Sequence, residues 1–340
     1  MPSVLRLPHE WETKLADPIN ITSFHGLDIP EREWGIEGLF YIPEVTHVVS
    51  GTGCGKSLNA MLMCLSLATG KPFARYKVPK PRKVLYLDGE MHPKEFQTRI
   101  QRCSFMTDKD YERCIENFKY WSGLLGENFP DLSDPETYDY LIEYLVKNKI
   151  EVLVVDNYFC MTRMKDYNSP QEVQKLEDNF VKPIKALGIA IIFVDHLSKS
   201  GHEYGTIVKL GFTENSIRIS YDKEAKIFSL SNMKARSLES DIDDLVYRIS
   251  PEDNSITVLD FELAKDPKES KAIEKNRIGN EFKKSYQDGM NRSDCLRKAM
   301  ETYKEKYELN DCLYSFQTLR GFITEWVADV GYVDDGVVNQ

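Results

Sequence analysis

The chain has 340 residues, of which 41% are apolar, 29% are charged and 11% are aromatic. This composition provides ample material for a folded core and excludes a mainly disordered or fibrous protein. The formal net charge of -10 excludes a surface that attracts phosphate backbones everywhere, so any nucleic-acid site must be local.

The cysteines and the apolar runs indicate the compartment. The seven cysteines are an odd set without a C-x-x-C pair, which argues against a disulfide framework and against a cysteine zinc site. The longest apolar runs have the length of strands, and the N-terminus lacks the basic and apolar regions of a signal peptide. We therefore expect a cytoplasmic protein without a membrane partner.

Strand-like and helix-like segments alternate between about Thr46 and Leu197, which predicts an α/β fold with a mainly parallel, doubly wound sheet. Short runs of β-branched and aliphatic residues are typical of strands that are covered on both faces. We expect four such strands, at residues 46–49, 84–87, 151–155 and 190–194. Helices are expected at residues 57–69, 93–103, 134–148 and 170–187.

The pattern changes after Leu197, where short alternating segments are separated by polar turns. Such segments are typical of antiparallel hairpins, and we expect them to extend one edge of the sheet. The expected strands are residues 216–221, 227–232, 245–249 and 255–259.

The two ends of the chain differ from the main domain, which we place at residues 27–262. Residues 1–26 form an N-terminal segment, and residues 263–292 are rich in Lys and Glu, which predicts a charged linker or a solvated helix. Residues 293–340 are expected to form a small helical unit. This unit is interpreted as an appendage that packs on the core or on a neighbouring subunit, or else as a winged-helix or helix-turn-helix DNA-binding module.

Residues 50–57 read S-G-T-G-C-G-K-S between a predicted strand and a predicted helix, and this context identifies a phosphate-binding P-loop. Its three glycines let backbone N–H groups point at phosphates, and the helix N-terminus adds a positive partial charge. Lys56 supplies a full charge and Ser57 a hydroxyl ligand for magnesium, while Ser50 stands where such loops usually begin with glycine. The expected nucleotide-binding residues are Gly51, Thr52, Gly53, Cys54, Gly55, Lys56, Ser57 and Leu58.

Carboxylates follow two of the predicted central strands. Asp156 ends one apolar run, and a carboxylate at the carboxyl end of a parallel strand lies where ligands bind, so Asp156 is expected to hold magnesium. Glu90 follows the strand at residues 84–87 and is expected to be the general base that orients the attacking water, with Asp88 as its competitor. The alternative for each acid is to cap a neighbouring turn or helix.

Three further polar residues complete the predicted site. His196 follows the fourth strand and is expected to sense the γ-phosphate or its water, the alternative being a core histidine. Lys234 and Arg236 alternate at the end of a hairpin strand, so both point to the same side. Cations beyond the sheet edge are poorly placed for their own P-loop, which predicts an arginine finger that serves a neighbouring subunit in a ring or filament. The alternative is a pair of solvated surface cations.

Six motifs occur in the order found in a known family. They are I-P-E-R-E-W-G-I-E-G-L-F, the P-loop, V-L-Y-L-D-G-E-M with a following E-x-x-x-R-I, V-V-D-N, V-D-H-L-S-K-S-G and K-A-R. Over about residues 27–259 the chain resembles the RecA-fold ATPases of the RepA-like kind, the small hexameric replicative helicases of plasmids and phages. It is more distantly similar to the DnaB-type helicases and to KaiC.

The resemblance implies a RecA-like P-loop core, ATP as the nucleotide and Mg²⁺ as the metal. It also implies a homo-oligomer, a hexameric ring with ATP sites between subunits, that unwinds DNA in phage or plasmid replication. A primase or a loader is a possible partner, and a phage-encoded protein would act in the cytoplasm of the host cell. The residues to which the family assigns catalysis are Lys56, Glu90, His196, Lys234 and Arg236.

In the family, the loops after the third and fourth core strands face the central channel and touch single-stranded DNA. These loops correspond to residues 157–169 and 198–209. Cations that neutralise phosphates beside aromatic rings that stack on bases suit a single-strand site. Residues 201–213 depart from the small-residue-rich stretch of the family. The expected DNA-binding residues are Arg163, Lys165, Lys199, Tyr204 and Lys209.

Two other functions compete with the helicase. One is a KaiC-like or RadA-like ATPase that acts in recombination or protein remodelling without unwinding DNA. The other is a nucleotide-switched scaffold in which hydrolysis is vestigial. The complete set of P-loop, base, magnesium ligand, sensor and finger argues against the scaffold.

Overall fold

The computed structural model describes residues 20–29, 31–125, 129–132, 134–162, 166, 169–197, 209–235, 245–259, 267–287, 291–307 and 311–330. Within these ranges no helix is long and apolar enough to cross a membrane. All seven cysteines lie within them, and each is a free thiol.

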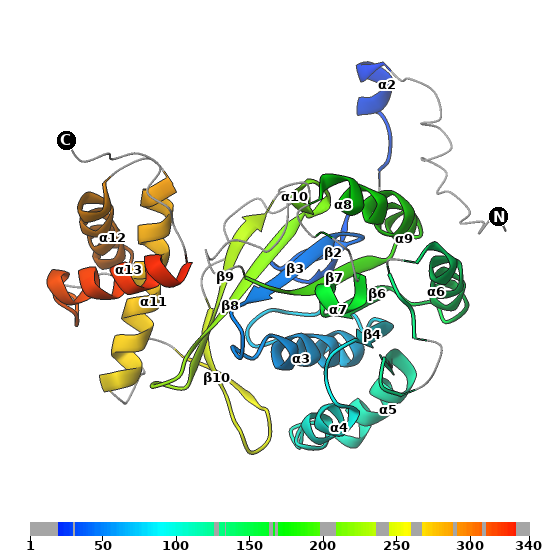
Figure 1. The fold of residues 1–340 in the computed structure, drawn as a ribbon, viewed down its shortest axis with the longest axis horizontal. Coiled ribbons are helices and arrows are strands. Elements are labelled where there is room, and N and C mark those ends of the chain that lie inside the picture. Colours follow the sequence, from blue (N-terminus) through cyan, green and yellow to red (C-terminus); the bar gives the residue numbers. More distant parts are fainter. Residues whose placement is uncertain are drawn as a thin grey trace.

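Nine strands of the described chain form one sheet in the order β11-β10-β9-β8-β3-β7-β6-β4-β5 (Figure 1). In chain order they are β3 (Val45–Ser50), β4 (Val84–Asp88), β5 (Phe118–Ser122), β6 (Val152–Asp156), β7 (Ala190–His196), β8 (Asn215–Asp222), β9 (Ile227–Ala235), β10 (Leu245–Ile249) and β11 (Ile256–Val258). The strands from β3 to β8 are parallel to their neighbours, whereas β9, β10 and β11 continue the sheet in antiparallel fashion. The predicted fold class, a mainly parallel sheet extended at one edge by hairpins, is confirmed.

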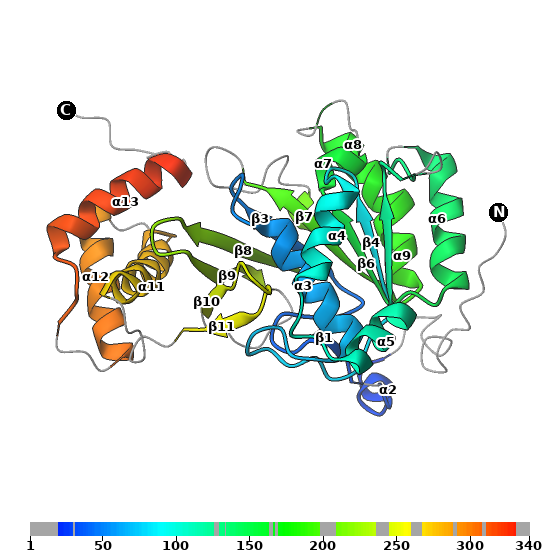
Figure 2. The same cartoon turned by 90° about the horizontal axis from the view of Figure 1, so that it is seen from below.

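Helices cover both faces of the parallel part, as Figures 1 and 2 show. One face carries α3 (Lys56–Thr69), α4 (Pro93–Gln101) and α5 (Asp108–Asn117). The other carries α6 (Pro135–Lys147), α7 (Tyr158–Thr162), α8 (Pro170–Leu176), a π-helical turn (Glu177–Val181) and α9 (Lys182–Ala186), with the short α10 (Lys209–Phe212) near α8. The strands are therefore enclosed between two helical layers.

The pleat of the strands divides the core in two and also places the polar strand ends. In β6, Val152 and Val154 pack in the cluster that contains α3, whereas Leu153 and Val155 pack in the cluster that contains α8 and α9. Successive side chains of a strand point to opposite faces. Asp156 therefore continues the α3 face of β6, and the same alternation puts Asp88 of β4 and His196 of β7 on that face. Three polar strand ends thus face the helix that follows the P-loop.

The helix expected at residues 170–187 is divided into α8, the π-helical turn and α9. The N–H of Lys182 donates to the carbonyl of Glu177, five residues earlier. Pro183 follows directly, lacks an N–H group and crowds the preceding turn, which favours this wider turn over a continuous α-helix. Helix α5 and strand β5 were not expected from the sequence.

The N-terminal elements lie outside the large sheet. Strands β1 (Glu33–Ile36) and β2 (Phe40–Ile42) form a two-stranded antiparallel sheet in which Trp34 and Tyr41 stack with ring centroids 3.7 Å apart. Helix α2 (Ile21–His25) precedes them, contributes no buried residue and projects from the body of the molecule (Figure 1).

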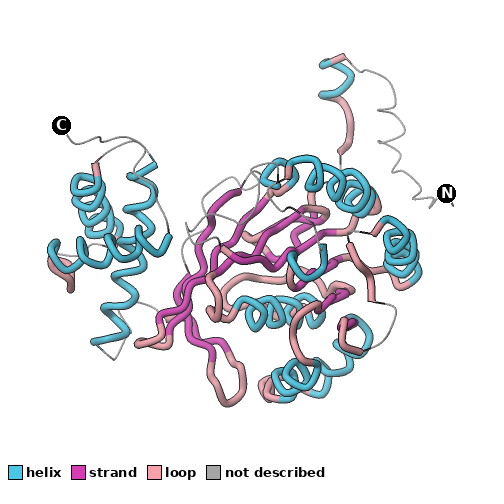
Figure 3. Tube along the Cα trace, in the orientation of Figure 1, coloured by secondary structure: helices cyan, strands magenta, loops and turns pink. Residues whose placement is uncertain are grey.

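Three helices form a small unit beside the antiparallel edge of the sheet (Figure 3), and the first of them packs on that edge through Ala272 and Ile273. They are α11 (Pro267–Gln287), α12 (Arg292–Lys306) and α13 (Phe316–Val330). The unit has its own apolar cluster, which includes Phe282, Leu296, Tyr303 and Leu319. The small helical unit expected at the C-terminus is therefore present, while the boundaries 1–26, 27–262, 263–292 and 293–340 stay predictions.

Candidate active site

The P-loop connects the centre of the sheet to α3. Strand β3 lies between β7 and β8 and ends at Ser50, and α3 begins at Lys56. The N-cap of α3, Gly55, makes no side-chain capping hydrogen bond, and no acidic residue lies in the first turn. The first N–H groups of this helix and its dipole therefore remain available for an anion such as a phosphate.

The loop needs glycine at two of its three glycine positions. Gly53 and Gly55 both have φ +72°, a left-handed conformation that glycine adopts without strain. A Cβ atom on Gly55 would also lie 2.8 Å from the ring of Phe228. Gly51 has neither restriction. Ser50, the departure from the usual first glycine, is buried and its hydroxyl donates to the carbonyl of Gly51 at 2.9 Å, so a serine closes this turn.

Lys56 and His196 lie in contact. His196 ends β7, which is adjacent to β3, and Lys56 begins the helix that follows β3. Ser50 pairs with His196 in the register of β3 and β7, and the Lys56 Nζ lies 3.2 Å from His196 Nδ1. Burial and then the charge of Lys56 lower the pKa of His196. The imidazole is therefore neutral at pH 7 with Nδ1 as the acceptor, which leaves Nε2–H as a donor for another group.

Asp156 is a deeply buried carboxylate of the site. Only 1% of the residue is exposed, and its Oδ2 accepts a 2.6 Å hydrogen bond from the hydroxyl of Tyr86. Its buried Oδ1 has no hydrogen-bond partner among the residues that the structure describes. Burial raises the pKa of Asp156 to about 6, although the hydroxyls of Tyr86 and Ser57 oppose that shift. A buried oxygen without a partner is costly, so Oδ1 is poised for a ligand.

The open Oδ1 of Asp156 makes this site suitable for Mg²⁺. Mg²⁺ prefers oxygen ligands and is usually held by one or two protein groups together with substrate phosphates. The open Oδ1 of Asp156 and the nearby hydroxyl of Ser57 are ligands of that kind. Within the described ranges, no group of three or more His, Cys, Asp or Glu side chains forms a separate metal cluster. The site therefore suits a metal ion that binds together with the phosphates of a nucleotide.

Glu90 differs from Asp156 in being exposed, although it follows the neighbouring strand. Asp88 and Asp156 are opposite each other in the register of β4 and β6. The Nδ2 of Asn157 donates to a carboxylate oxygen of Glu90, and the Oδ1 of Asn157 accepts from the N–H of Cys160 at 2.9 Å. The side chain of Glu90 therefore reaches solvent beside the P-loop and is held by the amide of Asn157, the residue that follows β6.

Sequence reasoning missed three polar partners of these carboxylates. They are Tyr86, Tyr120 and Asn157. Tyr86 carried a signal, because it lies two residues before Asp88 and so points to the same face of a predicted strand. No sequence pattern indicated the position of Tyr120, because strand β5 itself was not expected.

Among the described residues, the site is rich in negative charge. Asp88 lies close to both Glu90 and Asp156, and the ammonium group of Lys56 opposes the charge of Asp156. The mutual repulsion of Asp88 and Asp156 contributes to the raised pKa of Asp156. A polyphosphate would add further negative charge, so the site suits a phosphate ligand that brings a divalent cation.

The predicted trans finger lies partly outside the described residues. Lys234 is in β9, where it pairs with Ser216, and Ser216 pairs with His47 of β3. The four residues from His47 to Gly51 span about 13 Å of strand, so the backbone of Lys234 lies that far behind the P-loop and two strands to the side. Arg236 lies outside the described residues, and the role of both cations stays a prediction.

The predicted DNA-binding residues also lie mostly outside the described residues. Arg163, Lys165, Lys199 and Tyr204 are not described, and only the backbone of Lys209 is described, at the start of α10. The structure places the beginning of each segment, and the first of them, expected as a loop at residues 157–169, starts with helix α7 (Tyr158–Thr162). The two segments leave the sheet after β6 and β7, which end at Asp156 and His196, at the edge that carries the candidate site.

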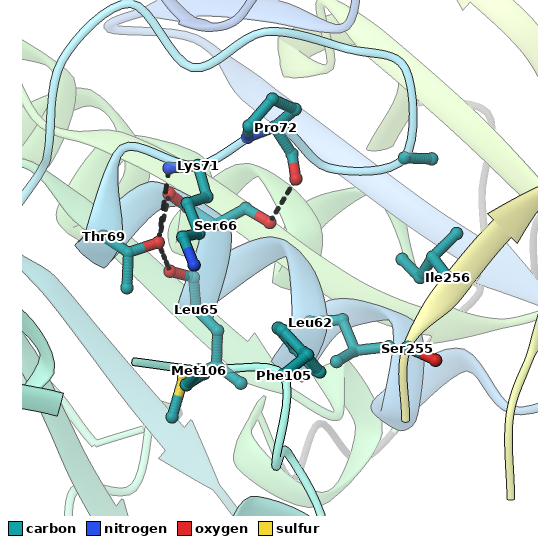
Figure 4. A pocket seen from close by; sticks show the side chains of 11 residues that line it. Leu62, Leu65, Ser66, Thr69, Lys71, Pro72, Phe105, Met106, Ser255 and Ile256 are labelled. Atoms are coloured by element: carbon teal, nitrogen blue, oxygen red, sulfur yellow. Dashed lines mark hydrogen bonds between the residues drawn. The ribbon is translucent and has the colours of Figure 1, made fainter. Parts of the chain in front are cut away.

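Two cavities lie at a distance from the P-loop, on the same face of the sheet. One has a volume of about 340 Å³ and lies at the C-terminal end of α3, with Leu62, Leu65, Met106 and Ile256 in its lining (Figure 4). The other, of about 550 Å³, lies between α4, α5 and β5. Both are mainly apolar, and in the first cavity the polar groups of Thr69 and Lys71 are already bonded within the protein.

Comparisons with known proteins agree with this geometry. The family described as AAA domain matches residues 15–202, more than half of the chain. Among solved structures, a KaiC-like protein from the hyperthermophilic archaeon Pyrococcus horikoshii OT3 is similar, with a TM-score of 0.50 at 14% identity over 68% of this chain and 99% of that chain. At this identity the likeness shows the fold alone. No curated protein matches the sequence.

Proposed function

The chain belongs to the AAA domain family of P-loop ATPases, and we propose that it hydrolyses ATP to move along single-stranded DNA and unwind duplexes as a ring. The observation that supports the ATPase most strongly is the convergence at one sheet edge. An open helix N-terminus, Lys56, the partnerless oxygen of Asp156 and the exposed Glu90 meet there. The movement on DNA rests on the ordered motifs in the sequence.

The residues divide the work of hydrolysis between them. The N–H groups of the P-loop and Lys56 hold the phosphates of ATP, and Ser57 and Asp156 hold Mg²⁺. Bound Mg²⁺ neutralises charge on the phosphate oxygens. Glu90 orients a water and takes its proton while the water oxygen bonds to the γ-phosphorus and the bond to ADP breaks. The Nε2–H of neutral His196 donates to the γ-phosphate or to the attacking water.

A second subunit supplies further positive charge to this site. Within the part of the chain that the structure describes, the network holds three carboxylates and Lys56, and the strand that carries Lys234 runs away from its own P-loop. Arginine fingers stabilise the charge of the transferring phosphoryl group from outside the P-loop. Lys234 and Arg236 of one subunit complete the neighbour's site, and repetition of this head-to-tail contact closes a ring, for which we propose six subunits.

The position of the two loops supports DNA as the partner. The segments of residues 157–169, which begins with α7, and 198–209 follow the strands that end at Asp156 and His196. A change at the γ-phosphate can therefore alter the loops directly. Cations and an aromatic ring in these loops suit a sequence-tolerant single-strand site even though the whole chain is acidic. We propose Arg163, Lys165, Lys199, Tyr204 and Lys209 as the contacts.

The experiment is ATP hydrolysis with and without circular single-stranded DNA, together with the mass of the assembly in the presence of ATP and Mg²⁺. The proposal expects a closed oligomer whose hydrolysis rises severalfold with DNA. A monomer whose rate of ATP hydrolysis is the same with and without DNA would contradict the ring and the DNA partner but not the ATPase activity. A closed oligomer without response to DNA would favour a KaiC-like ATPase that acts on proteins.

A further inference from the structure

Two acids flank Gly89 at the end of strand β4, Asp88 as its last residue and Glu90 beyond it, and their surroundings differ. Glu90 is exposed, whereas only 1% of Asp88 is exposed. Both oxygens of Asp88 accept hydrogen bonds from the protein. Its Oδ1 accepts from the N–H groups of Glu90 at 3.0 Å and Met91 at 2.8 Å. Its Oδ2 accepts from the hydroxyl of Tyr120 at 2.8 Å. Asp156, in contrast, keeps an open oxygen.

Tyr120 is itself held in place. It lies on β5, opposite Tyr86 in the register of β4 and β5. Its ring stacks on Phe96 of α4, with centroids 3.9 Å apart and planes 16° apart. Burial, followed by the hydrogen bond to Asp88, raises the pKa of Tyr120, so the phenol keeps its proton and donates. The ring and the hydroxyl therefore fix the direction from which Asp88 is held.

The turn that carries Glu90 is consequently fixed at two points. Asp88 holds its backbone through the N–H groups of Glu90 and Met91, and Asn157 holds its carboxylate. A catalytic base works only within hydrogen-bond reach of its proton, and a displacement of about 1 Å can cost a hundredfold in rate. The contacts of Asp88 thus determine where the base lies.

We propose that Asp88 is a positioning residue that holds Glu90 for catalysis, that Tyr120 anchors Asp88 in this role, and that Asp88 does not itself touch the nucleotide. The inference rests on the proposed hydrolysis of ATP at this site. It distinguishes the two acids of the D-G-E motif, which the sequence alone could not do. Glu90 takes the proton, and Asp88 serves as a hydrogen-bond acceptor.

The Asp88→Asn variant separates the two roles. An asparagine Oδ1 still accepts from both N–H groups, and its Nδ2 donates to the oxygen of Tyr120, so all three contacts survive without the charge. Asp88→Ala removes all three. The expected kcat of Asp88→Asn is within about threefold of wild type, whereas Asp88→Ala loses about 10- to 100-fold with the affinity for ATP unchanged. Tyr120→Phe, which removes the anchor, is expected to fall between them.

A double variant tests whether Asp88 acts through Glu90. In the Glu90→Gln background the base is already lost, so adding Asp88→Ala should lower kcat by less than about threefold further. A purely structural Asp88 would cost its full factor in both backgrounds, because effects of independent residues add in free energy. Binding of a fluorescent ATP analogue and the thermal unfolding midpoint show that each variant is folded.

The results separate the inference from the proposed function. If the wild-type protein does not hydrolyse ATP, the proposed function fails. If it does, and Asp88→Asn is as slow as Glu90→Gln, Asp88 is the base and the inference is overturned. Full additivity of Asp88→Ala with Glu90→Gln overturns it as well. If Asp88→Ala does not fold, the decision falls to Asp88→Asn and Tyr120→Phe.

Discussion

The two ends of helix α3 present opposite environments. At its N-terminal end the first N–H groups have no side-chain cap, and the nearby Asp156 keeps a buried oxygen without a partner. At its C-terminal end the polar groups are already satisfied. Thr69 donates to the carbonyl of Leu65 at 2.7 Å (Figure 4), and Lys71 pairs with Asp110 at 2.5 Å. The cavity of about 340 Å³ lies at this second end.

The comparison teaches that polar groups without partners indicate the candidate active site in this protein, whereas the cavity does not. A buried polar atom without a partner has a free-energy cost that a ligand removes. An apolar hollow has no such preference for a phosphate. The two ends are about 21 Å apart, since α3 has 14 residues at 1.5 Å each. Variants at the two ends should therefore affect different properties of the molecule.

The largest expected effect separates the two lysines near these ends. Lys56→Ala should abolish ATP turnover, because it removes the P-loop charge that follows the γ-phosphate as it leaves. Lys71→Ala is the matched control, since Lys71 only pairs with Asp110 and should leave turnover unchanged. The measurement is steady-state phosphate release by both variants. Normal turnover in Lys56→Ala would remove the basis for the nucleotide site.

The next effect extends the comparison to the far end of β9. Arg236→Ala should bind ATP almost normally but hydrolyse it about a thousandfold more slowly, the range found for arginine fingers. Mixing it with Lys56→Ala should restore some activity, because an intact P-loop then meets an intact finger at a mixed interface. The readout is an ATPase titration of one variant into the other. Inactive mixtures that demonstrably co-assemble would argue for a finger that acts within its own subunit.

A smaller effect is expected for the apolar end of α3. Leu65 is buried beside the cavity, so Leu65→Ala should lower the free energy of unfolding by about 2–5 kcal/mol. ATP turnover per folded molecule should not change, because the substitution leaves the N-terminal end intact. Denaturant unfolding and phosphate release at a temperature where both proteins are folded provide the two values. A loss of turnover without a loss of stability would mean that this end takes part in the chemistry.

The smallest effect concerns the loops that leave the sheet beside the site. Replacing Arg163 and Lys199 by alanine should weaken binding of single-stranded DNA and reduce its salt dependence by about one to two counterions. Basal ATP hydrolysis should stay the same. Affinity for a labelled oligonucleotide at several salt concentrations measures this slope. An unchanged affinity would move the DNA site to another surface, such as the helices α11 to α13.

The fold and the site were predictable from the sequence where local pattern decides the outcome. The P-loop, Asp156 and His196 each follow a short apolar run, and parallel strands bring their carboxyl ends to one edge. Helix α5 was also within reach, since Thr107 and Asp110 form a capping box at its start. Its highly charged sequence, with few apolar residues, gave little sign of a buried face.

What the sequence could not provide depends on pairing between distant segments. Strand β5 has partly exposed residues and a mixed polar pattern, so the segment F-K-Y-W-S gave no clear strand signal. The hydrogen bond from Tyr120 to Asp88 requires the register of β4 and β5 across more than thirty residues. The contact of Asn157 with Glu90 likewise requires β6 to lie beside β4. Local periodicity carries no information about such neighbours.

The most direct test of the central claim is strand displacement on a forked DNA duplex with ATP and Mg²⁺. The account predicts that the wild-type protein releases the displaced strand. Glu90→Gln should bind ATP and DNA but hydrolyse ATP at least about a hundredfold more slowly, so it should release no strand in the same time. Hydrolysis that DNA stimulates without any displacement by the wild-type protein would contradict the helicase and favour an ATPase that acts on DNA without unwinding it.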